Sequence, residues 1–431
     1  MPLGPSLIFD KSSLESLNLD EAVLMDNFYM STITPLFFVE CLADLEKQIR
    51  KSKSTPEQLV GSLADRTPES QSYPNVHHIN VLKAELSRQF DLSKVFGRVM
   101  LAGGEPVQLG DKKGFVFRRS PEAEALERWT RREFLEIERT TAKEWRRALG
   151  ATDLDAMVKT VKAELGHWRR PNSLSDAKHL ADTIIDYMDP EWLLRFGTNL
   201  LGVPEATDWV VADWIGRRRP PLREHVPYFI FLLTINIFFC LALPAQLLKN
   251  VKASHRVDLA YLYYLPFCSM FTSKDNFHAQ IAPLFLGPNQ EFIDGIQFKD
   301  DLRRLNEYYS ALPAEVLKTG LINFAAHPPE DEDFLVTRMW DKFLPRWRSI
   351  KAQPKPERDH EAEKQLFKEI DQLSQSGLPS HYERDMDKVD YAQIIRMVLP
   401  RKGKWLRFSE EQIRRIYERK SEQESGEPLT G

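Results

Sequence analysis

The chain has 431 residues, of which 42% are hydrophobic and 28% are charged, and its formal net charge is −4. This balance is typical of a globular protein and excludes a disordered or fibrous chain, and the length indicates one large domain with insertions or two to three domains. The slight negative charge excludes a whole-molecule attraction to polyanions, so any binding of nucleic acid depends on local basic patches.

The cysteines and the N-terminus predict a cytoplasmic protein. Cys41, Cys240 and Cys268 lie in apolar contexts without any C-x-x-C pair, which is usual where thiols stay reduced. Residues 1–5 lack the basic region that opens a secretory signal peptide.

The first predicted strand ends in an aspartate, and so does a strand far downstream. Leu7-Ile8-Phe9 precedes Asp10, and the apolar run 267–272 leads to Asp275. In a parallel α/β sheet, chemistry collects beyond the carboxyl ends of the strands, so two such strands can aim two carboxylates into one crevice. The sequence therefore predicts an α/β fold with a parallel sheet whose strands end at these aspartates.

The remainder of the first 50 residues supplies more of this core. A helix is expected after Asp10, followed by a strand-to-helix segment over residues 29–40. Glu40 then lies near the first turn of the helix that follows. We take residues 1–50 as the first part of the core.

Residues 51–222 are predicted to be a mainly helical insertion, with a β-hairpin near residues 103–117. Its arginine pairs alternate with tryptophans, which fits either a track for a phosphate backbone or a solvated helix face with tryptophans in the core. The second interpretation is favoured. The residues concerned are Trp129, Arg131, Arg132, Trp145, Arg146, Arg147, Trp168, Arg169 and Arg170.

Residues 228–245 are almost wholly apolar and have two interpretations. By length they could span a bilayer, whereas Pro227 and Pro244 frame an ordinary helix buried on all sides. A single span here would place Asp10 and Asp275 on opposite faces of the membrane. The buried helix is therefore favoured, and a membrane-anchored protein is the alternative.

The α/β pattern resumes at His255. A short helix over 257–264, a strand over 267–272 and a helix over 275–286 are expected, so residues 223–305 form the second part of the core. Residues 306–431 are predicted to be a helical C-terminal region with a linker near 350–360. His278 has no partner at zinc spacing, and we expect it to be a surface or core histidine.

Four acidic residues, each at a strand end or near a helix start, fit one site: Asp10, Glu40, Asp258 and Asp275. Taken singly, each aspartate would equally serve as a helix cap or turn residue. Taken together, they would repel one another unless a cation neutralised them, and Mg²⁺ and Mn²⁺ prefer oxygen ligands. The cluster therefore predicts Mg²⁺ or Mn²⁺ as the cofactor.

The residues around these acids resemble a known family. Ile8-Phe9-Asp10-Lys11-Ser12-Ser13-Leu14 resembles the opening motif of PIN-like domains, with the PIN/5′-nuclease fold. Asp258 and the later Thr272-Ser273-Lys274-Asp275 resemble the closing motifs, and Glu40 fills the helical acidic position. The match covers about residues 5–50 and 225–290, and the phrase 258–268 is similar to large uncharacterised bacterial PIN-like proteins.

The resemblance implies a PIN-like three-layer α/β/α core with a central parallel sheet. It also implies a metal-dependent nuclease that hydrolyses phosphodiester bonds, in RNA rather than DNA, and that serves as a toxin or defence effector. Asp10, Glu40, Asp258 and Asp275 would bind one or two metal ions. Ser12 or Ser273 would orient a carboxylate or phosphate, and Lys274 would contact the scissile phosphate, unless it simply faces solvent. The alternative is a non-catalytic PIN-like binding or scaffold protein, whose helical insertion holds a protein partner.

Overall fold

The computed structural model describes most of the chain. The described residues are 4–51, 53–68, 75–89, 96–109, 112–117, 121–141, 144, 154–165, 168–248, 255–351, 372 and 399–414. Almost all of the linker predicted near 350–360 lies outside them.

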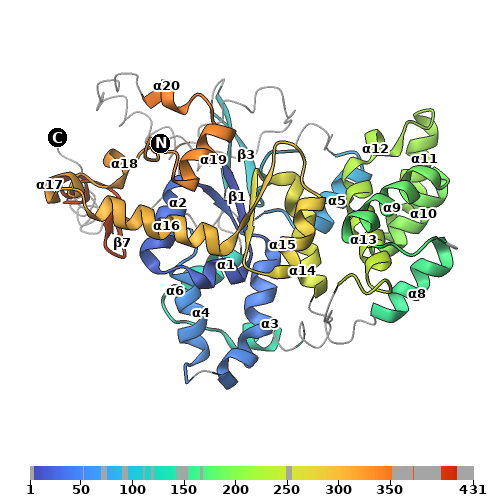
Figure 1. Ribbon diagram of the computed structural model, residues 1–431, viewed down its shortest axis with the longest axis horizontal. Coiled ribbons are helices and arrows are strands. Elements are labelled where there is room, and N and C mark those ends of the chain that lie inside the picture. The colour runs from blue at the N-terminus through green and yellow to red at the C-terminus, as the bar shows by residue number, and fades with distance from the viewer. Residues whose placement is uncertain are drawn as a thin grey trace.

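Within the described residues, a four-stranded parallel sheet forms the centre of the molecule (Figure 1). Its strands lie in the order β2-β1-β5-β6, and the predicted α/β class with a central parallel sheet is confirmed. The strand bounds are β1 Ser6–Phe9, β2 Met30–Thr32, β5 Met270–Ser273 and β6 Glu291–Asp294.

The strands are apolar on both faces because helices cover both sides. Leu7, Phe9 and Met270 face one hydrophobic cluster, whereas Ile8 and Phe271 face another. Successive strand residues point to opposite faces, so this alternation places the sheet between two helical layers. The arrangement is compatible with a three-layer α/β/α core.

The layer that contacts Leu7 and Phe9 contains α2 (Leu19–Phe28), α16 (Gly295–Ser310) and α19 (Leu335–Phe343). Buried Asp301 on α16 accepts hydrogen bonds from the Leu335 and Val336 amides, at 2.7 and 3.0 Å, and so caps α19. Helices α4 (Pro56–Ala64) and α6 (Pro121–Thr130) extend this layer and pack against α3 (Pro35–Lys51).

The opposite layer is built around α13 (Pro227–Ala242). Most of its side chains are buried, including Phe229, Ile235 and Phe239. Glu85 on α5 (His78–Leu86) accepts from the Tyr228 and Phe229 amides at 2.9 and 2.7 Å and caps this helix. The interior helix expected at 228–245 is confirmed, and within the described part of the chain no helix has both the length and the apolarity to cross a membrane.

Further helices surround α13 and the sheet. Around α13 lie α8 Leu154–Leu165, α9 Leu174–Tyr187, α10 Pro190–Leu200, α11 Thr207–Gly216 and α12 Leu222–His225, with the 3₁₀ turn η2 Pro204–Ala206. At the sheet lie α1 Lys11–Ser16, α14 His255–Tyr261, η3 Leu262–Phe267, α15 Asn276–Ile281 and η4 Ala282–Leu284. The C-terminal part contains α17 Ala314–Leu317, α18 Leu321–Phe324 and α20 Trp347–Lys351.

The described residues also form two antiparallel hairpins. The predicted hairpin is confirmed as β3 (Gly104–Leu109) and β4 (Lys112–Phe117). A second, β7 (Arg401–Lys402) with β8 (Trp405–Leu406), packs on α2. There Arg407 and Asp26 form a buried ion pair at 2.6 Å, which anchors residues 401–407 to the core.

One predicted strand has different bounds. The strand expected over 267–272 begins only at Met270, because residues 262–267 form a 3₁₀ turn that contains Pro266. The helix expected over 275–286 likewise divides into α15 and η4. Neither shift moves Asp275 from the end of its strand.

Candidate active site

The sheet topology brings the two strand-end aspartates together. From β1 the chain passes to β2 on one side, and much later to β5 on the other side. Where strand connections diverge in this way, the crevice beyond the carboxyl ends of the strands is the usual ligand site. Asp10 follows β1, and its amide donates to the Thr272 carbonyl of β5 at 3.3 Å.

Asp10 is buried and heavily hydrogen bonded. It is 3% exposed and caps α1, with the Ser13 amide donating to Oδ1 at 2.9 Å. The Ser12 hydroxyl lies 3.0 and 2.8 Å from its two oxygens, and the Ser273 hydroxyl lies 2.6 Å from Oδ2. These four donor contacts fix the carboxylate in one orientation.

An ion pair with His278 sets the charge of Asp10. The His278 Nδ1 lies 3.5 Å from the Asp10 Oδ2. Burial raises the pKa of Asp10, but His278, Ser273 and Ser13 outweigh it, so this pKa lies below its usual range. Burial lowers the pKa of His278, but Asp10 and Asp258 overcome this and raise it to about 9. Both groups are therefore charged at neutral pH.

The two serines tie β1 to the end of β5. Ser273 is fully buried, and its hydroxyl accepts from the Asp275 amide at 2.9 Å while it contacts Asp10. The Ser12 hydroxyl accepts from the Lys274 amide at 3.2 Å. Both therefore orient a carboxylate, and the exposed side chain of Lys274 forms no ion pair with the described residues.

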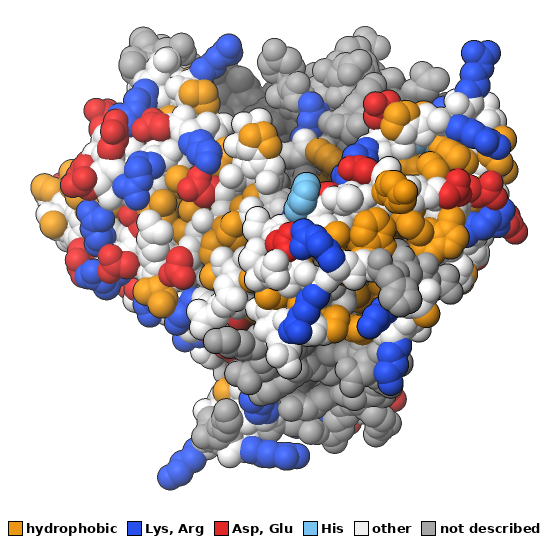
Figure 2. Space-filling model, turned by 45° about the vertical axis from the view of Figure 1, so that its right-hand side comes forward, with side chains coloured by type: hydrophobic (Ala, Val, Ile, Leu, Met, Phe, Trp, Pro, Cys, Tyr) orange, Lys and Arg blue, Asp and Glu red, His pale blue; other side chains and the backbone are white. Residues whose placement is uncertain are grey.

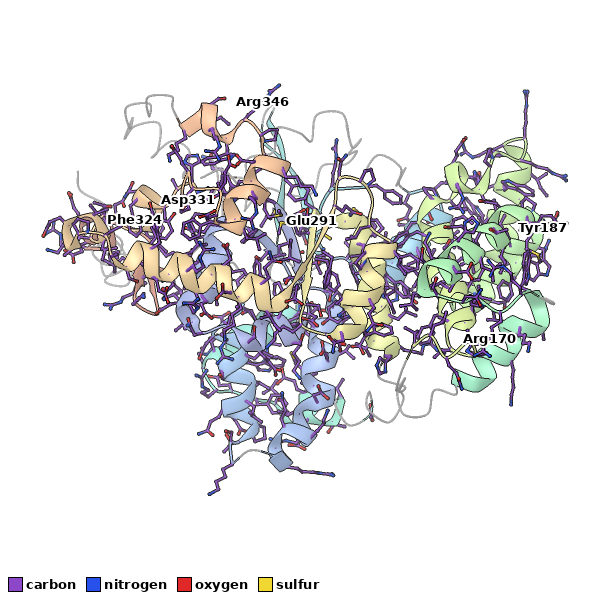
Figure 3. All side chains as sticks on the ribbon, viewed as in Figure 1. Arg170, Tyr187, Glu291, Phe324, Asp331 and Arg346 are labelled. Atoms are coloured by element: carbon purple, nitrogen blue, oxygen red, sulfur yellow. The ribbon has the colours of Figure 1, made fainter. Side chains whose placement is uncertain are left out.

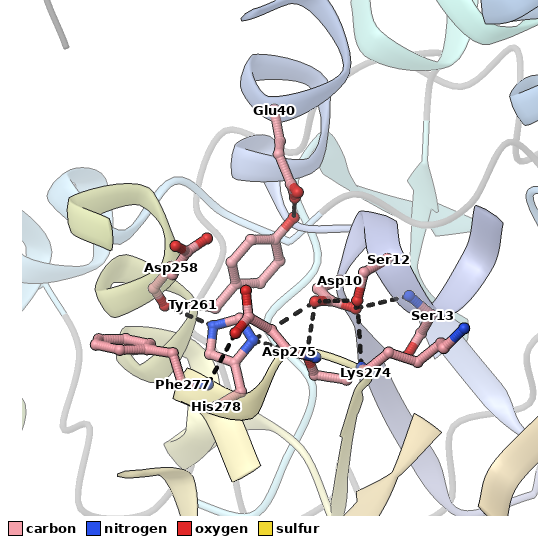
Figure 4. Close-up of polar contacts among 11 residues, drawn as sticks. Asp10, Ser12, Ser13, Glu40, Asp258, Tyr261, Lys274, Asp275, Phe277 and His278 are labelled. Carbon is pink, nitrogen blue, oxygen red and sulfur yellow. Dashed lines mark hydrogen bonds and ion pairs between the residues drawn. The ribbon is translucent and has the colours of Figure 1, made fainter. Parts of the chain in front are cut away.

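Glu40 lies in the second turn of α3, on the opposite side of the site. Its Oε2 accepts from the Tyr261 hydroxyl at 2.9 Å (Figure 4). Burial and the negative charges of Asp10 and Asp258 raise its pKa to about 8, although Lys11 and the Tyr261 hydrogen bond oppose the shift. Without a cation beside it, Glu40 is thus half protonated near pH 8.

Asp258 and Asp275 come from neighbouring elements. Asp258 lies in the first turn of α14, and burial raises its pKa, with Asp275 and Asp10 adding to the shift against His278 and His255. Asp275 caps α15 by accepting from the Phe277 amide at 2.8 Å. The carboxylates thus interact electrostatically from four separate parts of the chain.

Figure 4 shows the resulting arrangement, with the Asp275 carboxylate between those of Asp258 and Asp10 and with Glu40 across from them. Asp10 and Asp275 also act as helix caps, as expected of a single aspartate at such a position. As the side chains stand, no three His, Cys, Asp or Glu residues in the described part of the chain are arranged to hold a metal ion.

Lys11 adds a second buried positive charge at the edge of the site. It is 3% exposed, and its Nζ lies 3.0 Å from Asp44 and 3.5 Å from Glu15. Burial lowers its pKa, but the acidic groups of Cys41, Asp44, Glu15 and Glu40 outweigh burial and raise it. Lys11 therefore stays charged and bound to Asp44 and Glu15.

Two residues of the site were not predicted as such, His278 and Tyr261. His278 is a core histidine, one of the two options expected, but its hydrogen bonds place it inside the acidic cluster. The available signal was helical spacing, because His278 follows Asp275 by three residues and Tyr261 follows Asp258 by three. Residues three apart share a helix face, so this spacing places both residues beside acids but does not indicate their contacts with Asp10 and Glu40.

The contact between Ser273 and His278 is not a nucleophile–base pair. The Ser273 Oγ lies 2.8 Å from His278 Nδ1, a distance that also occurs in hydrolases. Here the serine is fully buried and its hydroxyl points to Asp10. No substrate atom can reach it, so acyl transfer at this position is excluded.

The alternating arginines and tryptophans fit the favoured interpretation, a solvated helix face with tryptophans in the core. Arg132 pairs with Asp65 at 2.6 Å, and Arg169 pairs with Asp176. Trp129 is buried and donates to Glu138. Residues 145–147 lie outside the described part of the chain. Arg131 likewise pairs with Glu127 and Glu133, whereas Arg170 donates to the Ala245 carbonyl.

Similarity to other proteins gives no further guide to this site: no protein-family model, no curated protein and no solved structure matches the chain.

Proposed function

We propose that the chain is a nuclease that depends on Mg²⁺ or Mn²⁺ and hydrolyses phosphodiester bonds. The observation that carries this proposal is the meeting of the Asp10, Glu40, Asp258 and Asp275 carboxylates at the carboxyl edge of the parallel sheet (Figure 4), where Asp10 and Asp258 help to raise the pKa of Glu40. Carboxylates that lie close together at the carboxyl edge of a parallel sheet repel one another. A cation bound between them would offset this repulsion.

The residues fit a divalent cation by their chemistry. Carboxylate oxygens are the ligands that Mg²⁺ and Mn²⁺ prefer, and Asp10, Glu40, Asp258 and Asp275 would supply them. The raised pKa values of Glu40 and Asp258 mean that their charged forms are disfavoured, and a bound cation would favour these charged forms. When bound, such an ion supplies activation of water and stabilisation of the leaving oxygen.

The protein's own residues would position these groups. The Tyr261 hydroxyl orients Glu40, while Ser12 and Ser273 hold Asp10. Lys274 is exposed beside Asp275 and is available to contact a substrate phosphate. RNA as the preferred substrate, the PIN-like family and a role as a toxin or defence effector are proposals that rest on the resemblance of the motifs.

Cleavage of matched RNA and DNA tests this function. Purified full-length protein with Mn²⁺ should cut labelled single-stranded RNA faster than DNA of the same sequence. Glu40→Gln and Asp275→Asn should abolish the cutting. Asp294→Asn is the matched control, because Asp294 caps α16 at the end of the next strand, β6, and should leave the cutting intact. Cutting that persists in Glu40→Gln and Asp275→Asn would contradict the assignment.

A second candidate is a non-catalytic binding or scaffold protein. The face of α11 supports it, because Trp209 and Ile215 are 46% and 43% exposed, and Ala212 lies between them at the same helical spacing. Tyr187 points outward at the edge of the same helical group (Figure 3), and hydrophobic side chains gather on this side of the molecule (Figure 2). A protein partner would bind there, and inactivity of the chain toward RNA and DNA with Mn²⁺ would favour this function.

A further inference from the structure

The far end of α3 carries positive charge that the chemistry proposed above does not use. Residues 47–53 contain four basic residues and no acid. The structure describes three of these side chains, Lys47, Arg50 and Lys53, and all three are exposed. We call these three residues the α3 basic segment. It lies at the tip of the protrusion that α3, α4 and α6 form below the sheet in Figure 1, where basic side chains project from the surface (Figure 2).

The α3 basic segment differs from the arginines on the other side of this protrusion. The four arginines between residues 128 and 139 are each paired with an acid. Within the described part of the chain, no acid pairs with any member of the α3 basic segment. Positive charges without an acidic partner attract a polyanion more strongly than paired ones do. The end of α3 is therefore the part of the protrusion that fits a chain of phosphates.

Helix α3 connects this segment to the acidic site. Glu40 lies in its second turn, and Lys47 follows seven residues later, two turns further along nearly the same face. At a rise of about 1.5 Å per residue, Lys47 and Arg50 lie about 10 and 15 Å beyond Glu40 along the helix. Asp44 lies on the same face between them, but the Lys11 Nζ is 3.0 Å from its carboxylate and offsets its charge.

Another exposed cation lies on the other side of the carboxylates. Figure 4 places Lys274 across the Asp10 carboxylate from Glu40, and the Lys274 side chain is exposed. A strand that leaves the acidic site thus meets positive charge in both directions. Proteins that bind single-stranded nucleic acid without sequence preference use basic surfaces that follow the backbone in this way. Because the α3 cations follow a single helix, they fit one strand.

We propose that a single RNA strand binds along α3, with its phosphates against the α3 basic segment, and continues over the carboxylates to Lys274. This inference rests on the proposed function, and it names the surface that holds the substrate of that site. The α3 cations would contact phosphates away from the bond that is cut. They would therefore hold the substrate equally before and during the reaction, which affects KM rather than kcat.

RNA affinity measured against salt concentration tests this surface. Full-length protein in EDTA, where Mn²⁺-dependent cutting does not interfere, is titrated into a labelled single-stranded RNA of about 20 nucleotides. Lys47→Gln combined with Arg50→Gln should weaken binding about tenfold, and the slope of log affinity against log salt should fall by about 1.4, or about 0.7 for each lost phosphate contact.

The matched control combines Arg131→Gln with Arg303→Gln. It also removes two exposed arginines, but each of these is paired with an acid, so the affinity and the slope should stay close to the wild-type values. Equal losses in the two double variants would overturn the α3 surface, because the net charge alone would then explain them. Thermal unfolding of both double variants should match the wild type, which shows that any loss of affinity is not a loss of fold.

Cutting with Mn²⁺ separates this inference from the proposed function. If the wild type cuts RNA, the Lys47→Gln and Arg50→Gln double variant should show a KM raised by about tenfold and a much smaller change in kcat. A wild type that cuts RNA, with an unchanged KM and affinity in this double variant, would overturn the α3 surface alone. A wild type that binds RNA through α3 without cutting it would contradict the nuclease and support the surface. A wild type that neither binds nor cuts RNA would overturn both.

Discussion

The two sides of the acidic site differ in how they accommodate negative charge. On the β1 side, Asp10 is buried with several donors and a buried cation, and its pKa is lowered. On the side of α3 and α14, Glu40 and Asp258 are only partly buried, have few donors, and their pKa values are raised. On the first side the protein itself offsets the negative charge. On the second side Lys11 and His278 do not offset burial and the repulsion between carboxylates, so an added cation would have the larger effect there.

The largest change in stability should come from removing Asp10 on the β1 side. Asp10→Ala would leave the His278 imidazolium buried and unpaired, so we expect a loss of about 3–5 kcal/mol of unfolding free energy at neutral pH. Urea unfolding in EDTA measures this. Asp294→Ala, which removes only a helix cap, should cost about 1 kcal/mol. Equal losses in the two variants would show that Asp10 is no more than a cap.

Added Mn²⁺ should stabilise the folded protein by binding on the side of α3 and α14. At about one hundred times its dissociation constant, a single ion adds about 2.7 kcal/mol to the free energy of unfolding. Because Glu40 has a pKa of about 8 without metal, binding at pH 6 must release a proton. Thermal unfolding with and without Mn²⁺ should therefore show a larger shift at pH 8 than at pH 6. A shift of the same size in Asp275→Asn would place the ion elsewhere.

Glu40→Gln should remove a pH dependence from the metal-free protein. A carboxyl whose folded pKa is raised, here from 4.5 to about 8, costs nothing below pH 4.5 and destabilises the fold increasingly as the pH rises to 8. His278 adds to this trend, since its stabilisation is complete below pH 6.5 and is lost as the pH passes 9. Glu40→Gln should restore about 1.4 kcal/mol for each pKa unit that persists in solution, seen as a flatter plot of unfolding free energy against pH in EDTA. An unchanged slope would contradict the raised pKa.

The contrast between the two sides also explains what could be read from the sequence. Strand ends such as Asp10 and Asp275 can be recognised in the sequence because short apolar runs end near them. Since the strands are parallel, these ends lie at the same edge of the sheet. The apolar run framed by Pro227 and Pro244 likewise indicated α13. The pairing of Asp10 with His278 was not accessible, because it depends on how α15 folds back on β5 after the turn at Ser273. The pKa of Glu40 depends on its burial and on charges such as that of Asp258, which lies more than 200 positions away.

A smaller effect should follow from removing the hydrogen bond that Tyr261 donates to Glu40. Tyr261→Phe keeps the ring contacts with Phe271 and His278 but deletes the hydroxyl that lies 2.9 Å from Glu40. We expect a loss of about 1 kcal/mol at pH 6, where Glu40 is largely protonated, and more above pH 8, where the charged carboxylate loses a stronger bond. Urea unfolding at the two pH values measures the difference. Tyr263→Phe, which loses a bond to Asn236 away from the site, should show no such pH dependence.

The smallest change in stability should come from Lys274→Ala. This variant tests whether the Lys274 side chain contacts a substrate phosphate. The side chain is exposed and has no ion-pair partner among the described residues, so the unfolding free energy should stay within about 0.5 kcal/mol of the wild type. If it contacts phosphate, RNA binding should nevertheless weaken, and the slope of log affinity against log salt should fall by about one. Lys318→Ala provides the control, because it removes an exposed lysine that pairs with Glu315 on another part of the surface. Equal RNA affinity in the two variants would mean that Lys274 only faces solvent, and that a substrate would have to approach the carboxylates without its help.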